Sequence, residues 1–97
     1  MIVSRQQILE ARNRKCSWTE AELAAAIEAR FPGGGDLELA DLIAAWVADR
    51  ALPAATLRDC AWIAGKLAGQ RPRTVTALFH PATELERIAV TLSTPPP

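Results

Sequence analysis

The chain has few aromatic or sulfur-containing residues and no net charge. Its 97 residues include no tyrosine, two phenylalanines, three tryptophans, two cysteines and one histidine. Eleven basic and eleven acidic side chains cancel, so no overall field attracts the protein to nucleic acid or to an anionic membrane. No stretch reaches the roughly 18 apolar residues that span a bilayer, and the N-terminus lacks the layout of a secretory signal. These absences predict a cytoplasmic protein without a membrane partner.

The reactive side chains form no recognisable site. Cys16 and Cys60 have no cysteine or histidine at close spacing, which argues against a disulfide framework and against a zinc site. Cys60, Asp59 and His80 are the residue types of a thiol nucleophile and its base, but Cys60 falls on the apolar side of a predicted helix, where thiols are normally inert. The glycines of residues 33–36 lack the lysine that follows a phosphate-binding loop. We therefore expect no enzyme, no metal and no cofactor.

What the chain does contain is small apolar residues at helical spacing. Hydrophobic residues make up 49% of the chain and charged residues 23%, which is ordinary for a single globular domain of this length. Because alanine dominates the apolar fraction, close packing of helix on helix is the expected way to form a core. The sequence predicts one helical domain over residues 1–92 and a proline-rich tail or linker over residues 93–97.

Four helices are predicted before residue 70. Capping boxes at Ser4 and Thr19 begin the first two, of which the first is expected to run from Arg5 to about Lys15. Asp36 is expected to cap the third, whose apolar residues recur at helical spacing: Leu39, Leu42, Ile43, Trp46 and Val47. The fourth begins at Pro53 and is expected to bury one stripe: Leu57, Cys60, Ala61, Ala64, Leu67 and Ala68.

The last third of the sequence fits two structures. Residues 75–79 are compatible with a short helix, and Thr83 with Glu86 forms a third capping box ahead of further apolar residues. β-Branched residues in 74–79 and 88–92 make a C-terminal β-hairpin the alternative. Since capping and apolar spacing coincide from Thr83 onward, the predicted fold class is all-α, a compact bundle of four main helices plus one or two short C-terminal helices.

One tryptophan lies off the buried stripe of the fourth helix. Trp62 falls in a row with Arg58 and Lys66, and an aromatic ring with cationic neighbours is typical of interface hot spots. If residues 75–92 packed over this ring, Trp62 would instead belong to the core. The acidic side of the third helix is a second candidate surface, with Glu38, Asp41 and Asp49. These surfaces predict a non-catalytic protein–protein interaction module, a small adaptor or inhibitor that docks on a larger protein or complex.

A DNA-binding regulator is the alternative function. The third and fourth helices are joined by a tight turn, as in a helix-turn-helix, and Arg71 and Arg73 would then contact nucleic acid. The zero net charge, the acidic third helix and the scarcity of base-reading side chains on the fourth helix count against this alternative. The sequence leaves the identity of the partner and the oligomeric state open.

Overall fold

Helices form most of this domain. The computed structural model describes residues 1–12, 15–70 and 80–93, and these ranges contain five helices: α1 (Arg5–Glu10), α2 (Glu20–Arg30), α3 (Leu39–Ala48), α4 (Ala54–Leu67) and α5 (Pro81–Ser93). Two strands of two residues each, β1 (Ile2–Val3) and β2 (Leu37–Glu38), pair in antiparallel register, with Val3 opposite Leu37. The predicted helical fold class is confirmed, with this small sheet as an addition.

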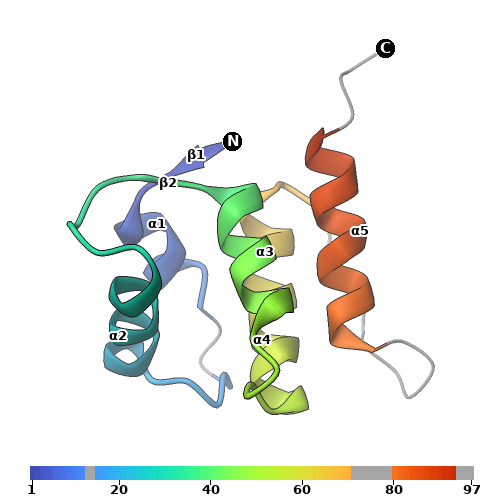
Figure 1. The fold of residues 1–97 in the computed structure, drawn as a ribbon, viewed down its shortest axis with the longest axis horizontal. Helices are drawn as coiled ribbons and strands as arrows, with labels where there is room; N and C mark the ends of the chain where they lie inside the picture. Colours follow the sequence, from blue (N-terminus) through green and yellow to red (C-terminus); the bar gives the residue numbers. More distant parts are fainter. Residues whose placement is uncertain (13–14, 71–79, 94–97) are drawn as a thin grey trace.

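The three C-terminal helices, α3, α4 and α5, lie side by side (Figure 1). α3 runs in the opposite direction to α4 and α5, and α5 packs against both of them. α1, α2 and the small sheet lie on the other side of α3 and α4, where α1 packs against α2 and α4. The chain therefore forms a three-helix bundle, and the N-terminal elements cover its α3 and α4 side.

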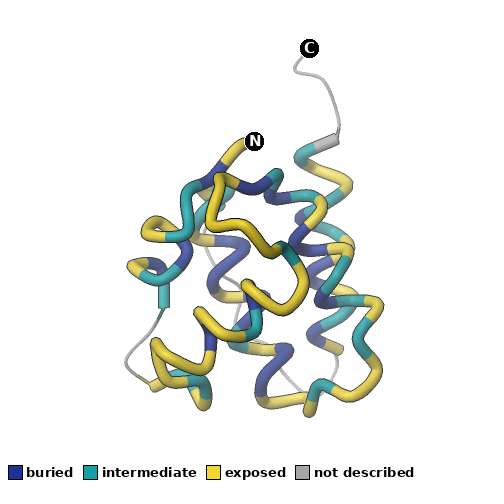
Figure 2. The backbone as a smooth tube through the Cα atoms, turned by 60° about the vertical axis from the view of Figure 1, so that its left-hand side comes forward, coloured by how far each residue is buried: buried dark blue, intermediate teal, exposed yellow. Residues whose placement is uncertain are grey.

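Each helix contributes buried apolar residues to the core (Figure 2), together with Val3 and Leu37 of the two strands. In α3, Leu39, Leu42, Ile43 and Trp46 are buried, as predicted. α4 buries more than the expected stripe, because Ile63 and Thr56 are buried in addition to Leu57, Cys60, Ala61 and Ala64, whereas Leu67 and Ala68 are half-buried. α5 contributes Leu85 and Ile88, both fully buried. Burial on both flanks of α4 follows from its position between α1 and α5.

The two N-terminal capping boxes are present, but α1 is shorter than expected. Ser4 and Thr19 each accept a hydrogen bond from the third residue of their helix, at 3.1 Å in both cases. α1 ends at Glu10 and not near Lys15, so Arg12 follows the helix. The Arg12 guanidinium donates to the carbonyl oxygen of Trp18 at 3.0 Å, which ties the chain after α1 to the segment before α2. This bond to a later residue accompanies the early end of the helix.

The start of α3 also differs from the prediction. Asp36 is exposed and does not cap the helix, because the next two residues pair with β1. α3 begins at Leu39, whose amide donates to the carbonyl oxygen of Met1 at 2.9 Å. The strand partner therefore satisfies an N–H group that a capping side chain was expected to satisfy.

The C-terminal segment is helical, as predicted, and does not form the alternative β-hairpin. Residues 81–93 form a single helix, so the predicted hairpin pairing of residues 88–92 is wrong. α5 begins two residues before the Thr83 capping box, because Pro81 suits the first helical position and His80 Nδ1 accepts from the Ala82 amide at 3.2 Å. Ser93 belongs to this helix and not to the tail. The predicted short helix at 75–79 and residues 94–97 lie outside the described residues.

Candidate functional site

The outward side of α4 carries the row that the sequence singles out. Arg58, Trp62 and Lys66, four residues apart on the helix, are all exposed, and we call them the α4 outer face. Trp62 is 37% exposed, so one part of the ring contacts the protein and another part faces solvent. Trp18 is half-buried and Trp46 is only 6% exposed. Trp62 is therefore the tryptophan most available to another molecule.

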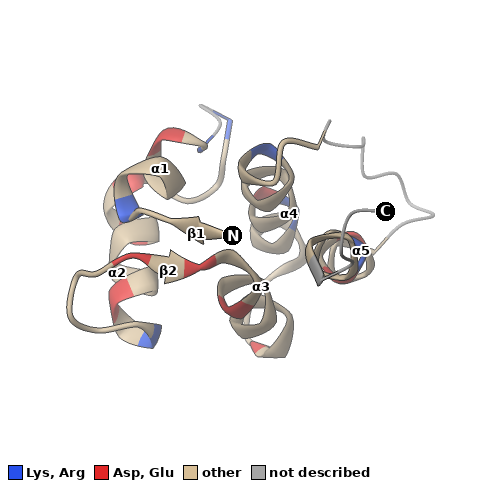
Figure 3. Ribbon diagram, turned by 90° about the horizontal axis from the view of Figure 1, so that it is seen from above, with Lys and Arg blue, Asp and Glu red and all other residues tan. Residues whose placement is uncertain are grey.

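The two cations of the α4 outer face have no ion-pair partner among the residues that the structure describes. Asp59 lies next to Arg58 in sequence, but its Oδ2 atom accepts hydrogen bonds from the amide and hydroxyl of Ser17, both at 2.7 Å. Within the part of the chain that the structure describes, neither Arg58 nor Lys66 forms an ion pair. Figure 3 shows these basic residues on α4, whereas the charged residues of α2, α3 and β2 are mostly acidic.

The second predicted surface is not a continuous acidic patch. Glu38 accepts from the ammonium group of Met1 at 2.6 Å, and Asp49 forms an ion pair with Arg30 at 3.4 Å. Asp41 is exposed and is not part of an ion pair among the residues described. Internal pairing therefore leaves Asp41 as the main carboxylate of this side that a partner would meet. Arg71 and Arg73, the predicted nucleic-acid contacts, lie outside the described residues.

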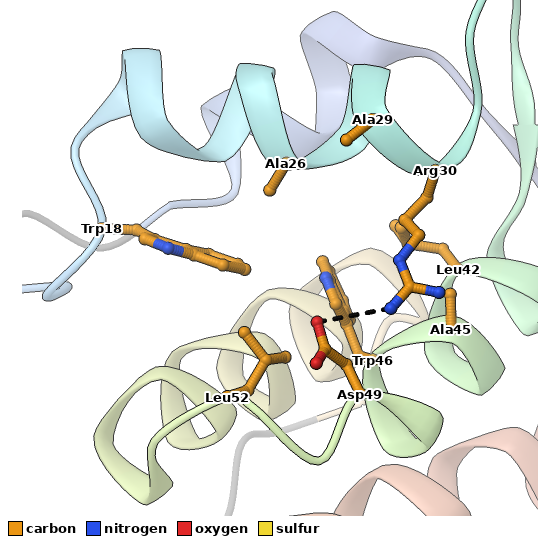
Figure 4. A pocket seen from close by; sticks show the side chains of 9 residues that line it. All are labelled: Trp18, Ala26, Ala29, Arg30, Leu42, Ala45, Trp46, Asp49 and Leu52. Atoms are coloured by element: carbon orange, nitrogen blue, oxygen red, sulfur yellow. Dashed lines mark ion pairs between the residues drawn. The ribbon is translucent and has the colours of Figure 1, made fainter.

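A pocket that the sequence does not indicate lies between α2, α3 and the turn before α4 (Figure 4). Its volume is about 140 Å³, and we call it the Trp18–Trp46 pocket. The two indole rings lie 6.5 Å apart at an angle of 48°. The remaining lining residues are Ala26, Ala29, Arg30, Leu42, Ala45, Asp49 and Leu52. The only hint in the sequence is Trp18 directly before a capping box, and nothing local pairs it with Trp46.

The position of α2, which forms one wall of this pocket, depends on Arg5. Its guanidinium donates to the carbonyl oxygens of Phe31 and Gly35 and forms an ion pair with Glu28 at 3.2 Å. These contacts hold the end of α2 and the following turn against α1. In that turn Gly33 and Gly34 have φ values of +111° and +76°, which favour glycine. The Gly33 amide donates to the Glu28 carboxylate at 3.2 Å, so an internal carboxylate already occupies part of the loop where a phosphate would bind.

The residues with catalytic chemistry do not form a reactive centre. Cys60 is fully buried, as its place on the apolar stripe predicts, and burial raises the pKa of its thiol far above the usual range, with Asp59 and Cys16 adding to the effect. A neutral, buried thiol is a poor nucleophile. His80 is exposed and uses Nδ1 to cap α5. No cluster of three or more potential metal ligands occurs in residues 1–12, 15–70 and 80–93.

The fold and these surfaces define a small helical domain with an exposed aromatic–cationic helix face and a separate aromatic pocket. None of the helices in the described residues is long and apolar enough to cross a membrane. Comparison of the chain with protein-family models, with curated proteins and with solved structures gives no match. The functional proposal therefore depends on the physical chemistry of the residues alone.

Proposed function

We propose that this domain is a non-catalytic protein–protein interaction module, an adaptor or inhibitor that docks on an acidic surface of a larger protein through the α4 outer face. The observation that carries the proposal is the exposure of Trp62 between Arg58 and Lys66, with neither cation in an ion pair among the described residues. The proposal places the module in the cytoplasm, and the lack of a disulfide between Cys16 and Cys60 supports this.

The chemistry of the three side chains determines the kind of partner. Tryptophan and arginine are enriched among the residues that dominate binding energy, because a large ring desolvates well and a guanidinium can form paired hydrogen bonds. Arg58 and Lys66 would pair with carboxylates of the partner that surround an apolar contact for Trp62. Both cations lie on one regular helix, so little backbone ordering is needed on binding.

A helix-turn-helix function has less support. In that motif the two helices cross at about 90–120°, whereas α3 and α4 lie side by side in opposite directions (Figure 1). The exposed residues of the first turn of α4 include Ala54 and Ala55, whose methyl groups cannot form hydrogen bonds to base edges. Arg58 is then the first side chain of α4 that could read a base.

Site-specific crosslinking tests the proposed function. A photoreactive residue at position 62 would be expressed in cells, and the same residue at Ala44, which is exposed on α3, would be the matched control. We expect a protein that crosslinks from position 62 and not from position 44. That protein, once purified, should bind the wild type at least about 10-fold more tightly than the Trp62→Ala variant.

Two outcomes would contradict the proposal. Identical crosslinked products from positions 62 and 44 would show that the α4 outer face has no preferred partner. A purified crosslinked protein that binds wild type and the charge-reversed Arg58→Glu, Lys66→Glu variant equally well would exclude an acidic docking surface. The variant must retain the wild-type circular dichroism spectrum for this comparison.

A further inference from the structure

The Trp18–Trp46 pocket has the size of one aromatic ring. Its volume is about 140 Å³, and an apolar protein cavity of about 150 Å³ is large enough to bind benzene. Most of its lining is apolar, formed by methyl groups of alanines on α2 and α3 and by the side chains of Leu42 and Leu52. The walls therefore hold a single six-membered ring or a group of similar volume, and a larger ligand would extend from the mouth of the pocket into solvent.

The two tryptophans favour an aromatic occupant over an aliphatic one. Their rings are tilted by 48° with centroids 6.5 Å apart, so a third ring placed beside them can meet one face and one edge. Such tilted and edge-to-face contacts are favoured because the face of an aromatic ring is negative and its edge is positive. Figure 4 shows the far end of the Trp18 ring pointing toward Trp46, which places both rings at the same pocket.

One polar group of the pocket is available to a ligand. Trp46 is 6% exposed, and within the described residues its indole N–H donates to no other protein group. The indole nitrogen is not among the fully buried polar atoms that lack a partner, so it keeps contact with solvent. Figure 4 draws this nitrogen in the half of the ring toward α2. A ligand that carries an oxygen would accept from this N–H in place of water.

The mouth of the pocket is polar. Arg30 from the end of α2 and Asp49 from the end of α3 form an ion pair of 3.4 Å across it, and both side chains keep access to solvent, with 51% and 29% of their surface exposed. The ion pair is therefore in contact with water and adds polar groups beside an apolar interior. A ligand with an apolar ring and one polar substituent matches this combination of an apolar interior and a polar mouth.

We propose that the Trp18–Trp46 pocket is a binding site for a small monocyclic aromatic compound that bears a hydrogen-bond acceptor, with phenol as the simplest example. The site accepts the ring beside Trp18 and Trp46, and the oxygen of the ligand accepts from the Trp46 indole N–H. This site is separate from the α4 outer face, so it can bind its ligand whether or not the proposed protein partner exists.

The three tryptophans provide the measurement. In a ¹⁵N–¹H spectrum each indole N–H gives one resonance, and the Trp62→Phe and Trp18→Phe variants assign them by loss of a signal. Titration of the whole chain with phenol should shift the Trp46 and Trp18 resonances along a saturating curve and leave the Trp62 resonance nearly unchanged. For a ligand of seven heavy atoms we expect a Kd on the order of 1 mM.

Matched leucine substitutions on α3 separate pocket binding from other causes. Ala45 lines the pocket and Ala44 is exposed outside it, so Ala45→Leu should weaken phenol binding at least about 10-fold and Ala44→Leu should leave the Kd unchanged. If Ala45→Leu does not give a folded spectrum, Ala29→Leu on α2 fills the same pocket from the other wall.

Three results would overturn the proposal. The first is a linear, non-saturating shift of all three indole resonances, which would indicate nonspecific association. The second is unchanged phenol binding in a folded Ala45→Leu or Ala29→Leu variant, which would place the ligand elsewhere. The third is equal saturable binding of cyclohexanol, a non-aromatic alcohol of the same size, which would remove the role of the aromatic rings.

Discussion

Replacement of two tryptophans by alanine should have unequal effects on stability. Trp46 is 6% exposed and lies in the core, whereas Trp62 is 37% exposed on the α4 outer face. If Trp62 is a surface residue with one covered edge, Trp46→Ala must cost clearly more free energy of unfolding than Trp62→Ala. The comparison tests the exposure on which the proposed docking surface depends.

The expected magnitudes follow from burial. Truncation of a buried tryptophan to alanine costs about 3–5 kcal/mol, because the lost transfer free energy is joined by the cost of a cavity. Somewhat under two-thirds of the surface of Trp62 is buried, roughly 130 Å². The transfer free energy of this area is about 3 kcal/mol at most. Alanine retains part of this burial and the unfolded chain is not fully extended, so we expect about 1–2 kcal/mol. Water fills the vacated space, and no cavity cost is added.

Thermal unfolding followed by circular dichroism measures the difference. For a domain of about 100 residues each kcal/mol lowers Tm by about 4–8 °C, so Trp46→Ala should lower Tm by roughly 12–40 °C and Trp62→Ala by roughly 4–16 °C. Trp62→Phe is the conservative control and should be nearly as stable as the wild type. Equal melting temperatures for Trp46→Ala and Trp62→Ala would place Trp62 in the core and refute the surface assignment.

Two further predictions concern buried polar groups. Arg87 donates hydrogen bonds of 3.1 and 2.6 Å to the buried carboxylate of Glu84, which raises the pKa of Arg87. Arg87→Met should therefore lower the free energy of unfolding, measured by urea denaturation, by about 1–3 kcal/mol. An unchanged denaturation midpoint would contradict this role of Arg87. Burial keeps the Cys60 thiol neutral, so in a Cys16→Ser variant the Cys60 thiol should react with a thiol reagent only after denaturation, even when the pH rises from 7 to 9. Rapid labelling of the folded variant would show that the Cys60 thiol is accessible.

Features that depend on local sequence were predictable. The hydroxyls of Ser4 and Thr19 cap α1 and α2 because a capping box needs only residues three positions apart. The apolar spacing around Trp46 and Cys60 identified the buried sides of α3 and α4 for the same reason. The position of Trp62 also followed from this spacing, since a residue opposite a buried stripe faces away from the core.

Features that depend on contacts between distant segments were not predictable. β1 and β2 are two residues long, and their pairing has no sequence signal of its own, so Asp36 looked like the cap of α3. The early end of α1 accompanies a bond from Arg12 to Trp18, and the neutralised carboxylates of Glu38 and Asp49 have partners far away in the sequence. The Trp18–Trp46 pocket likewise requires α2 and α3 to be placed in space first.

The claim that the α4 outer face binds a protein rather than nucleic acid can be tested before any partner is known. Fluorescence anisotropy of a labelled random DNA duplex would be measured during titration with the whole chain at low and at moderate salt. Our account predicts no binding at either salt concentration, because Arg58 and Lys66 are two cations on a chain without net charge. Binding that is strong at low salt and falls steeply as salt rises would contradict it and would establish a nucleic-acid-binding domain.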